Sequence, residues 1–511
     1  MNENLYALLQ SRFPQDRAQI ALENAVGDTW TYAMLEETAA RYASYIRSLG
    51  VMPGDRIAVQ VEKSPEALFL YLACLQSGAV YLPLNSAYQE GEVDYFLGDA
   101  TPKIVVHQPK DETWMQALCA KRGTAHRFTL SEDNSAKNQQ IRGSWHESAL
   151  KAAPMLEVVD RKADDLASIL YTSGTTGRSK GAMITHRNLS SNALTLHRYW
   201  GFKPGDILLH ALPIFHVHGL FVACHTALLN GSKIIFHSKF DAKAAMAAMP
   251  RATVFMGVPT MYVRLLAEPA FTKAICANIR LFVSGSAPLL AETFHAFYER
   301  TGHTILERYG MTETGMITSN PLAGDRRGGT VGLPLPGIAL RVVDEDGNLC
   351  ANGDIGDLQV KGDNVLPGYW QMPEKNKEEF TSDGYFKTGD VGKIDADGYV
   401  TIVGRSKDLV ISGGYNVYPK EIELLLDEIA GVAESAVIGL PHPDFGEAVA
   451  AVIVKKPTSS LIDADVMAAM KGKLAAFKLP KRVFMVEDLP RNAMGKVQKN
   501  ELRRRYADTF K

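Results

Sequence analysis

The chain has 511 residues, of which 46% are hydrophobic and 22% are charged. A single compact core does not extend over that length, so two or more domains are expected. The 55 basic and 57 acidic residues leave a net charge of −2 without a basic block, which gives no support to a surface for nucleic acid or for an anionic membrane.

Cysteine spacing and the pattern of apolar segments bear on the cellular compartment of the protein. The five cysteines are widely scattered without a CxxC pair, so neither a zinc site nor a disulfide framework is expected. The first residues lack the pattern of a signal peptide, and the most apolar stretches, 67–84 and 219–229, are interrupted by polar side chains. We therefore expect a cytoplasmic protein with no membrane partner.

Between about residues 30 and 340, short apolar runs alternate with segments of helical period. Strands are expected at residues 56–61, 103–108, 233–238 and 279–285, and amphipathic helices at residues 65–75 and 290–301. This alternation is typical of α/β layers built on a parallel sheet.

After residue 340 glycine-punctuated strands dominate, with Asp346-Gly347 and Asp397-Gly398 as expected hairpin turns. The last hundred residues resemble a separate α+β unit, with a helix from Pro419 to Gly431 followed by a strand at 433–440. The apolar face of this helix is formed by Ile422, Leu425, Leu426 and Ile429. We place the domain joint at residues 404–408, which predicts a large domain of residues 1–404 and a small domain of residues 405–511.

The strongest local signal is YTSGTTGRSKG, from Tyr171 to Gly181. Its glycines let backbone N–H groups turn toward an anion, and its hydroxyls and Lys180 add donors and charge, which suits a polyphosphate. The spacing differs from that of a P-loop NTPase, and the next segment reads as a strand rather than a helix, so the loop is expected to cap a hairpin. Taken alone, an ordinary surface turn remains an alternative.

Further blocks downstream carry groups that a nucleotide requires. YGMTE, from Tyr309 to Glu313, combines an aromatic ring that can stack on adenine, a hydroxyl for a phosphate and a carboxylate for Mg²⁺. YFKTGD ends in Asp390, an acid suited to a ribose diol. GRSKDLVISGGYNVYPKEIE begins at Gly404, and PRNAMGKVQKN contains Lys496.

In this order the blocks resemble the acyl-adenylate-forming superfamily of acyl-CoA synthetases, luciferases and adenylation domains, over essentially the whole chain. Within it, LPIFHVHGLF, MGVPTMYVRLL, SGSAPLLA and ERYGMTET are similar to bacterial malonyl-CoA synthetases. The resemblance implies ATP, Mg²⁺ and coenzyme A as reactants. A carboxylate attacks the α-phosphate of ATP to give an acyl-AMP, and the CoA thiol then displaces AMP.

The resemblance also implies the site residues. Lys180, His216, Thr312, Glu313 and Lys496 would act in catalysis, with Glu313 on the metal and Lys496 between the substrate carboxylate and the phosphate. The expected nucleotide site comprises Thr172, Ser173, Gly174, Thr175, Thr176, Gly177, Lys180, Gly285, Ser286, Ala287, Pro288, Glu307, Arg308, Tyr309, Gly310, Met311, Thr312, Asp390, Arg405 and Lys496.

A rotating small domain would separate the two half-reactions, with Lys407 at the hinge and Ser412, Gly413 and Gly414 facing CoA. The resemblance also implies that a lysine acetyltransferase and deacetylase act on Lys496, where acetylation would remove the charge. The alternative for Lys496 is a solvated lysine in a basic tail, but the glycine before it and the proline–arginine pair before that favour the functional interpretation. For residues 412–414, a plain turn is nearly as well supported by the sequence alone.

Arg264 bears on the identity of the acid, because it stands in an otherwise apolar run. A buried guanidinium needs an anionic partner, and the second carboxylate of malonate would supply one, with Ser286 and His216 beside it. On residues alone, an outward-facing arginine on a short helix from Pro259 is favoured, and the resemblance reverses that preference. His218 is assigned to the core or to a supporting role, since no ligand cluster supports zinc.

The expected reaction is therefore ligation of malonate, or of methylmalonate, to CoA. An aryl or medium-chain acyl-CoA synthetase is one alternative, and its apolar acid would leave Arg264 unpaired. A non-catalytic nucleotide-binding module is another, against which the intact Lys180, Glu313, Asp390 and Lys496 argue.

Overall fold

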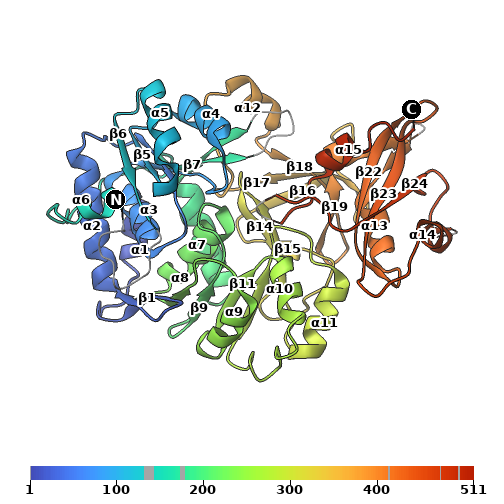
Figure 1. The fold of residues 1–511 in the computed structure, drawn as a ribbon, viewed down its shortest axis with the longest axis horizontal. Helices are drawn as coiled ribbons and strands as arrows, with labels where there is room; N and C mark the ends of the chain where they lie inside the picture. Colours follow the sequence, from blue (N-terminus) through green and yellow to red (C-terminus); the bar gives the residue numbers. More distant parts are fainter. Residues whose placement is uncertain are drawn as a thin grey trace. The chain divides into compact units, whose positions relative to one another are not determined.

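The computed structural model describes residues 2–131, 143–172, 179–412, 415–471, 473–492 and 495–510. The chain divides into two compact units (Figure 1). The first comprises residues 1–339 and 360–386, and the second comprises residues 340–359 and 387–511. The mixed α/β fold class is confirmed, and the domain boundary at residue 405 stays a prediction.

A six-stranded sheet lies at the start of the first unit, with strand order β6-β5-β3-β4-β7-β8. Its strands pair in parallel except for the antiparallel hairpin of β7 and β8, which is the hairpin expected around the phosphate loop. The strands are β3 (Arg56–Gln60), β4 (Val80–Pro83), β5 (Ile104–His107), β6 (His126–Thr129), β7 (Leu166–Thr172) and β8 (Lys180–Thr185).

Helices accompany these strands. The best buried is α3 (Pro65–Ser77), which Ser64 caps at its start and left-handed Gly78 ends. It packs against α2, and α4 packs against α5. The remaining elements are α1 (Leu5–Gln10), α2 (Tyr32–Ser48), α4 (Glu90–Ala100), η1 (Pro109–Asp111), α5 (Glu112–Arg122) and α6 (Ser144–Ala149).

A nine-stranded sheet completes the first unit, in the order β15-β14-β13-β12-β11-β9-β10-β1-β2. Its centre is parallel, and both edges end in antiparallel strands. The strands are β1 (Ile20–Asn24), β2 (Thr29–Thr31), β9 (Ile207–His210), β10 (Lys233–Phe236), β11 (Val254–Gly257), β12 (Leu281–Ser284), β13 (Leu306–Met311), β14 (Gly315–Ser319) and β15 (Leu333–Pro334).

One helix of this unit, α7 (His186–Tyr199), contacts both sheets, through β8 of the first and β14 of the second. Thr185 and Asn188 form a capping box that fixes its start directly after β8. Figure 1 shows α7 in the middle of the first unit. The other helices are the π-helix η3 (His218–Cys224), α8 (His225–Leu229), α9 (Ala242–Ala248), η4 (Met249–Arg251), α10 (Pro259–Leu266), α11 (Ala291–Thr301) and α12 (Pro373–Glu379).

The second unit contains two sheets. The four-stranded one is β16 (Ala339–Val343), β17 (Gly356–Lys361), β18 (Phe386–Ile394) and β19 (Val400–Arg405), and the five-stranded one is β20 (Val410–Ser412), β21 (Tyr415–Val417), β22 (Val432–His442), β23 (Gly446–Lys455) and β24 (Arg482–Val486). Its helices are η5 (Ser406–Asp408), α13 (Pro419–Asp427), α14 (Asp463–Met470) and α15 (Lys499–Arg505).

The hairpin turns and the apolar face expected in this unit are present. Gly347 and Gly398 both adopt positive φ in tight turns. Ile422 and Leu426 of α13 are buried in the core of the five-stranded sheet. The helix starts at Pro419 as expected but ends at Asp427, before Gly431. Successive turns then carry the chain through left-handed Gly431 into β22.

Candidate functional site

The two ends of the expected phosphate loop lie side by side. Thr172 at the end of β7 pairs with Lys180 at the start of β8 in the antiparallel register of the hairpin. Residues 173–178, which include the predicted Ser173, Gly174, Thr175, Thr176 and Gly177, lie outside the described residues. The hairpin thus brings one hydroxyl and one ammonium group to the same edge of the sheet.

Glu313, the expected metal ligand, lies within reach of this edge. Its Oε1 accepts a hydrogen bond from the Tyr369 hydroxyl at 3.0 Å and lies 3.4 Å from Thr172 Oγ1. The Tyr369 ring also lies beneath Lys180, whose Nζ is 4.0 Å from the ring centroid. Tyr369 therefore links the carboxylate expected on the metal to the lysine expected on the phosphates.

The residues present suit Mg²⁺. A carboxylate oxygen is a hard donor, and Mg²⁺ bound to nucleotides is commonly held by one or two carboxylates together with phosphates and water. In the described part of the chain, no group of three or more His, Cys, Asp or Glu side chains could form an all-protein metal cage. Glu313 would hold Mg²⁺ jointly with the phosphates, and the ion would neutralise their charge.

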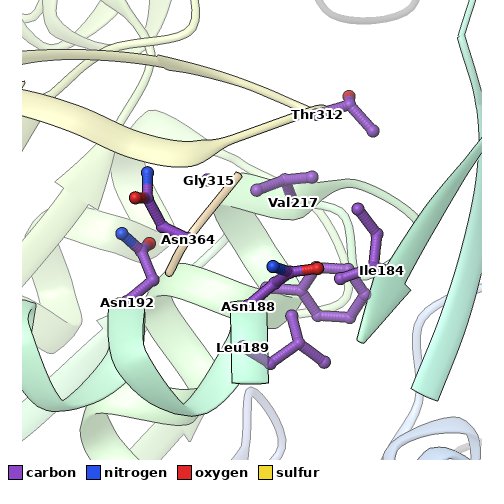
Figure 2. Close-up of a pocket in the computed structure, with 9 residues that line it drawn as sticks. Ile184, Asn188, Leu189, Asn192, Val217, Thr312, Gly315 and Asn364 are labelled. Atoms are coloured by element: carbon purple, nitrogen blue, oxygen red, sulfur yellow. The ribbon is translucent and has the colours of Figure 1, made fainter. Parts of the chain in front are cut away.

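A small pocket lies between α7 and the turn that joins β13 to β14 (Figure 2). Asn192 exchanges two hydrogen bonds with the backbone of Met316, at 2.9 and 3.1 Å. Asn188 donates to the carbonyls of Asp363 and Val365, both at 2.8 Å. Asn192 thus fastens β14, which follows the turn that carries Thr312, to α7, and Asn188 fastens the segment of residues 363–365 to the same helix. The lining residues are Ile184, Asn188, Leu189, Asn192, Val217, Phe221, Thr312, Gly315 and Asn364.

Arg308, in β13, is a charged residue buried within the first unit. It is only 2% exposed, and its Nε and Nη2 atoms have no hydrogen-bond partner among the described residues. Gly285 makes room for it, because a Cβ atom there would lie 2.5 Å from the Arg308 Cζ. Such a guanidinium is costly unless an anion joins it.

Two polar residues adjoin this guanidinium. Ser286, next to Gly285, has a φ of 73°. This left-handed backbone conformation is costly for residues other than glycine, and residues strained in this way cluster at ligand sites. Its Oγ lies 3.2 Å from Nδ1 of His218, and His218 Nε2 has no hydrogen-bond partner in the described structure. Arg308, Ser286 and His218 therefore present several polar atoms that a bound anion could satisfy.

Burial controls the charges in this group. It lowers the pKa of the Arg308 guanidinium to about 9, with Tyr262 opposing the shift, so Arg308 is still protonated at neutral pH. Burial, and then the nearby charge of Arg308, holds the pKa of His218 well below its usual range. The group thus carries one positive charge, on Arg308, beside a neutral imidazole.

The residues expected around the nucleotide base include Ser286 and Arg308 of this group and their chain neighbours. Gly285, Ser286, Ala287 and Pro288 follow β12, and Glu307, Arg308, Tyr309, Gly310 and Met311 belong to β13. Glu307 Oε1 accepts the backbone N–H of Leu289 at 3.2 Å, which fastens the segment after β12 to β13. The structure brings these two predicted blocks together, and their contacts with adenine stay a prediction.

Arg264 lies in a different environment. It is on the exposed face of α10, with its guanidinium 5.0 Å from the centroid of the Phe240 ring, while Met261, Tyr262 and Leu265 form the buried face. The burial that motivated an anionic partner for Arg264 is found at Arg308. His216 lies in the loop before η3, and His218, two residues later, is the histidine near Ser286.

The remaining predicted residues belong to the second unit. The register of β18 and β19 pairs Asp390 with Arg405, whose Nε lies 2.7 Å from Asp390 Oδ1. Lys407 is exposed in η5, and Ser412 is buried at the end of β20. Lys496 donates its backbone N–H to Asn492 Oδ1 at 3.0 Å. Gly413 and Gly414 lie outside the described residues.

The sequence interpretation missed two residues near the phosphate edge, Tyr369 and Glu379. Glu379 Oε1 lies 3.1 Å from Lys180 Nζ. Both residues come several tens of residues after β15 in the chain. Only the tertiary fold therefore reveals that they lie near Lys180. Aromatic and acidic residues in LPGYWQMPEKNKEEF, residues 366–380, are the only local signal.

Comparison with known proteins agrees with this geometry. Residues 9–370 match the AMP-binding enzyme family, and residues 421–496 match the AMP-binding enzyme C-terminal domain. A malonate–CoA ligase from Arabidopsis thaliana is 36% identical over 528 residues, covering 94% of this chain and 85% of that protein. A feruloyl-CoA synthase from Amycolatopsis sp. is also 36% identical, over 484 residues, covering 94% of each.

Among solved structures, the ATP-bound MatB from Rhodopseudomonas palustris is 54% identical, covers 100% of both chains and superposes with a TM-score of 0.96. In the ranges that the structure describes, no helix has both the length and the apolar character needed to cross a membrane. The reactants of this family are ATP, Mg²⁺, CoA and a carboxylic acid. The chain therefore belongs to the AMP-binding enzyme family and is an AMP-forming acid–CoA ligase.

Proposed function

We propose that the acid is malonate, with methylmalonate as the nearest alternative, and that Arg308 binds the carboxylate that does not react. The observation that carries this proposal is the buried guanidinium of Arg308, two of whose nitrogens have no partner in the described structure. A planar guanidinium can bind a carboxylate through two parallel hydrogen bonds. Ser286 follows Gly285, which faces the guanidinium, and its hydroxyl lies 3.2 Å from His218, whose pKa responds to the charge of Arg308. Both residues can add hydrogen bonds to the same group.

An apolar acid would suit this site poorly. A buried charge left without its partner costs about 3–5 kcal/mol, and a methyl or aryl group in place of the carboxylate leaves Arg308 in that condition. Malonate places its second carboxylate one methylene away from the reacting one, which limits how far Arg308 can lie from the reaction centre. The malonate–CoA ligase relative supports this assignment, whereas the equally similar feruloyl-CoA synthase makes an aryl acid the main rival.

In the first half-reaction, an oxygen of the other carboxylate attacks the α-phosphorus of ATP, and the bond to pyrophosphate breaks. Lys180 and Thr312 would bind phosphate oxygens, and Glu313, held by Tyr369, would bind Mg²⁺. Lys496 would bridge the attacking carboxylate and the phosphate. Acetylation of Lys496 would abolish that contact by removing its charge.

In the second half-reaction, the CoA sulfur attacks the acyl carbon, the thiol proton is lost, and AMP leaves with the electron pair of the broken bond. Rotation about Lys407 would exchange Lys496 for the segment that contains Ser412, and His216 would lie between the acyl and thiol groups. Asp390 and Arg405, already paired, would bind the ribose.

The test is pyrophosphate release with ATP and Mg²⁺, measured for malonate, methylmalonate, succinate, acetate, octanoate and 4-coumarate, with CoA thioester formation measured in parallel. Malonate is expected to give the highest kcat/KM of the six. A lead for 4-coumarate or octanoate would refute malonate as the substrate and leave the two-step ligase chemistry intact.

A further inference from the structure

Lys180 has a carboxylate partner within the folded chain. Its Nζ lies 3.1 Å from Oε1 of Glu379, the last residue of α12, and the side chains are 13% and 18% exposed. The Tyr369 ring closes another side of the ammonium group. The lysine expected to bind phosphate is therefore held between an aromatic face and an acid.

This ion pair conflicts with phosphate binding. A phosphate oxygen that reaches Lys180 Nζ at hydrogen-bond distance comes within a few ångströms of the Glu379 carboxylate, and two anions that close repel each other. ATP must then displace Glu379 or bind against its charge. Lys375, whose Nζ lies 3.3 Å from Glu379 Oε1, offers the carboxylate a second partner on the same helix.

We propose that Glu379 is a latch on Lys180, whose carboxylate competes with the phosphates of ATP and of pyrophosphate for the same ammonium group. The latch weakens ATP binding and, once the acyl-AMP has formed, recaptures Lys180 and favours the departure of pyrophosphate. Glu379 is a positioning residue that acts through Lys180. The inference rests on the proposed role of Lys180 in phosphate binding and does not depend on the identity of the acid.

The helix offers a matched control. Glu378 pairs with Lys375 at 3.0 Å, whereas within the described residues the acid paired with Lys180 is Glu379, so Glu378→Gln removes the same charge from the same helix turn without opening the latch. The experiment measures the Kd of Mg-ATP by calorimetry in the absence of any acid, and the inhibition constant of pyrophosphate in the full reaction.

Glu379→Gln is expected to tighten ATP binding by about two- to fivefold and to strengthen pyrophosphate inhibition by a similar factor, the range expected for a partly exposed ion pair. Glu378→Gln should change either constant by less than about 1.5-fold, because its charge is more exposed to screening. Damage to the fold would weaken binding, so a gain in affinity is specific to the latch. An unchanged or weaker affinity in Glu379→Gln would overturn the proposal.

A double-mutant cycle separates the latch from its premise. In a Lys180→Met background, Glu379→Gln should no longer alter the Kd of ATP, because the residue through which it acts is gone. Persistence of the gain in that background would overturn the proposal. Wild-type ATP affinity in Lys180→Met alone would refute the phosphate role of Lys180 and the latch with it, whichever acid the enzyme uses.

Discussion

Strand β13 and helix α10 each carry an arginine, but the two side chains differ in burial. Arg308 in β13 is 2% exposed and has two nitrogens without partners in the described structure, whereas Arg264 in α10 lies on an exposed face against Phe240. Water satisfies an exposed guanidinium at little cost, while a buried one depends on a ligand or a neighbouring acid. The apolar sequence around Arg264 therefore does not predict burial of its side chain.

The largest effect is expected from Arg308→Met, which removes the charge and approximately keeps the volume. The kcat/KM for malonate should fall on the order of a hundredfold, because the distal carboxylate loses a buried charged partner. The melting temperature should stay the same or rise, since an unpaired buried charge is replaced by an apolar side chain. Steady-state kinetics and thermal unfolding measure the two effects. A lower melting temperature would indicate a structural arginine instead.

Gly285→Ala tests the position of the Arg308 guanidinium without substituting the arginine itself. The new Cβ would lie 2.5 Å from Arg308 Cζ, so the guanidinium must move. We expect the KM for malonate to rise about tenfold, in line with a displaced hydrogen-bonding charge. An unchanged KM would mean that the position of Arg308 does not matter to the substrate.

Ser286→Gly removes a hydroxyl and relieves a left-handed backbone at once. The unfolding free energy should increase by about 1 kcal/mol, because glycine adopts positive φ without penalty. The kcat/KM for malonate should fall about three- to tenfold, the effect of one hydrogen bond. Chemical denaturation and kinetics on one preparation give both values. A variant that is more stable and equally active would remove Ser286 from the site.

Arg264→Ala should have the smallest effect, a change of less than about threefold in kcat/KM for malonate, because exposed charges contribute little to binding. A loss as large as that of Arg308→Met would reverse the comparison and restore Arg264 as the carboxylate-binding residue.

Much of the fold could be predicted from the sequence because its signals are local. Short apolar runs mark β3, β5, β10 and β12, and two strand-like runs around a glycine-rich loop mark the β7–β8 hairpin. Helical periodicity also predicts the exposure of Arg264, because Met261, Tyr262 and Leu265 define a buried face of α10 that does not include position 264.

The candidate site depends more on long-range packing. Arg308 is buried because β12 and β14 flank its strand and because Gly285 lacks a side chain, which no local pattern around YGMTE reveals. Because its burial could not be predicted, Arg308 was expected in the nucleotide site together with the rest of its sequence block. The contact between Lys180 and Glu379 joins residues 199 positions apart, so it could be found only in the folded chain.

The central claim is that Arg308 recognises a second carboxylate, and the most direct measurement compares malonate with propionate, which replaces that carboxylate by a methyl group. The ratio of their kcat/KM values is measured for wild type, Arg308→Met and Arg264→Ala. The account predicts a large ratio in wild type and Arg264→Ala that falls toward one in Arg308→Met. A ratio that survives in Arg308→Met and collapses in Arg264→Ala would contradict it.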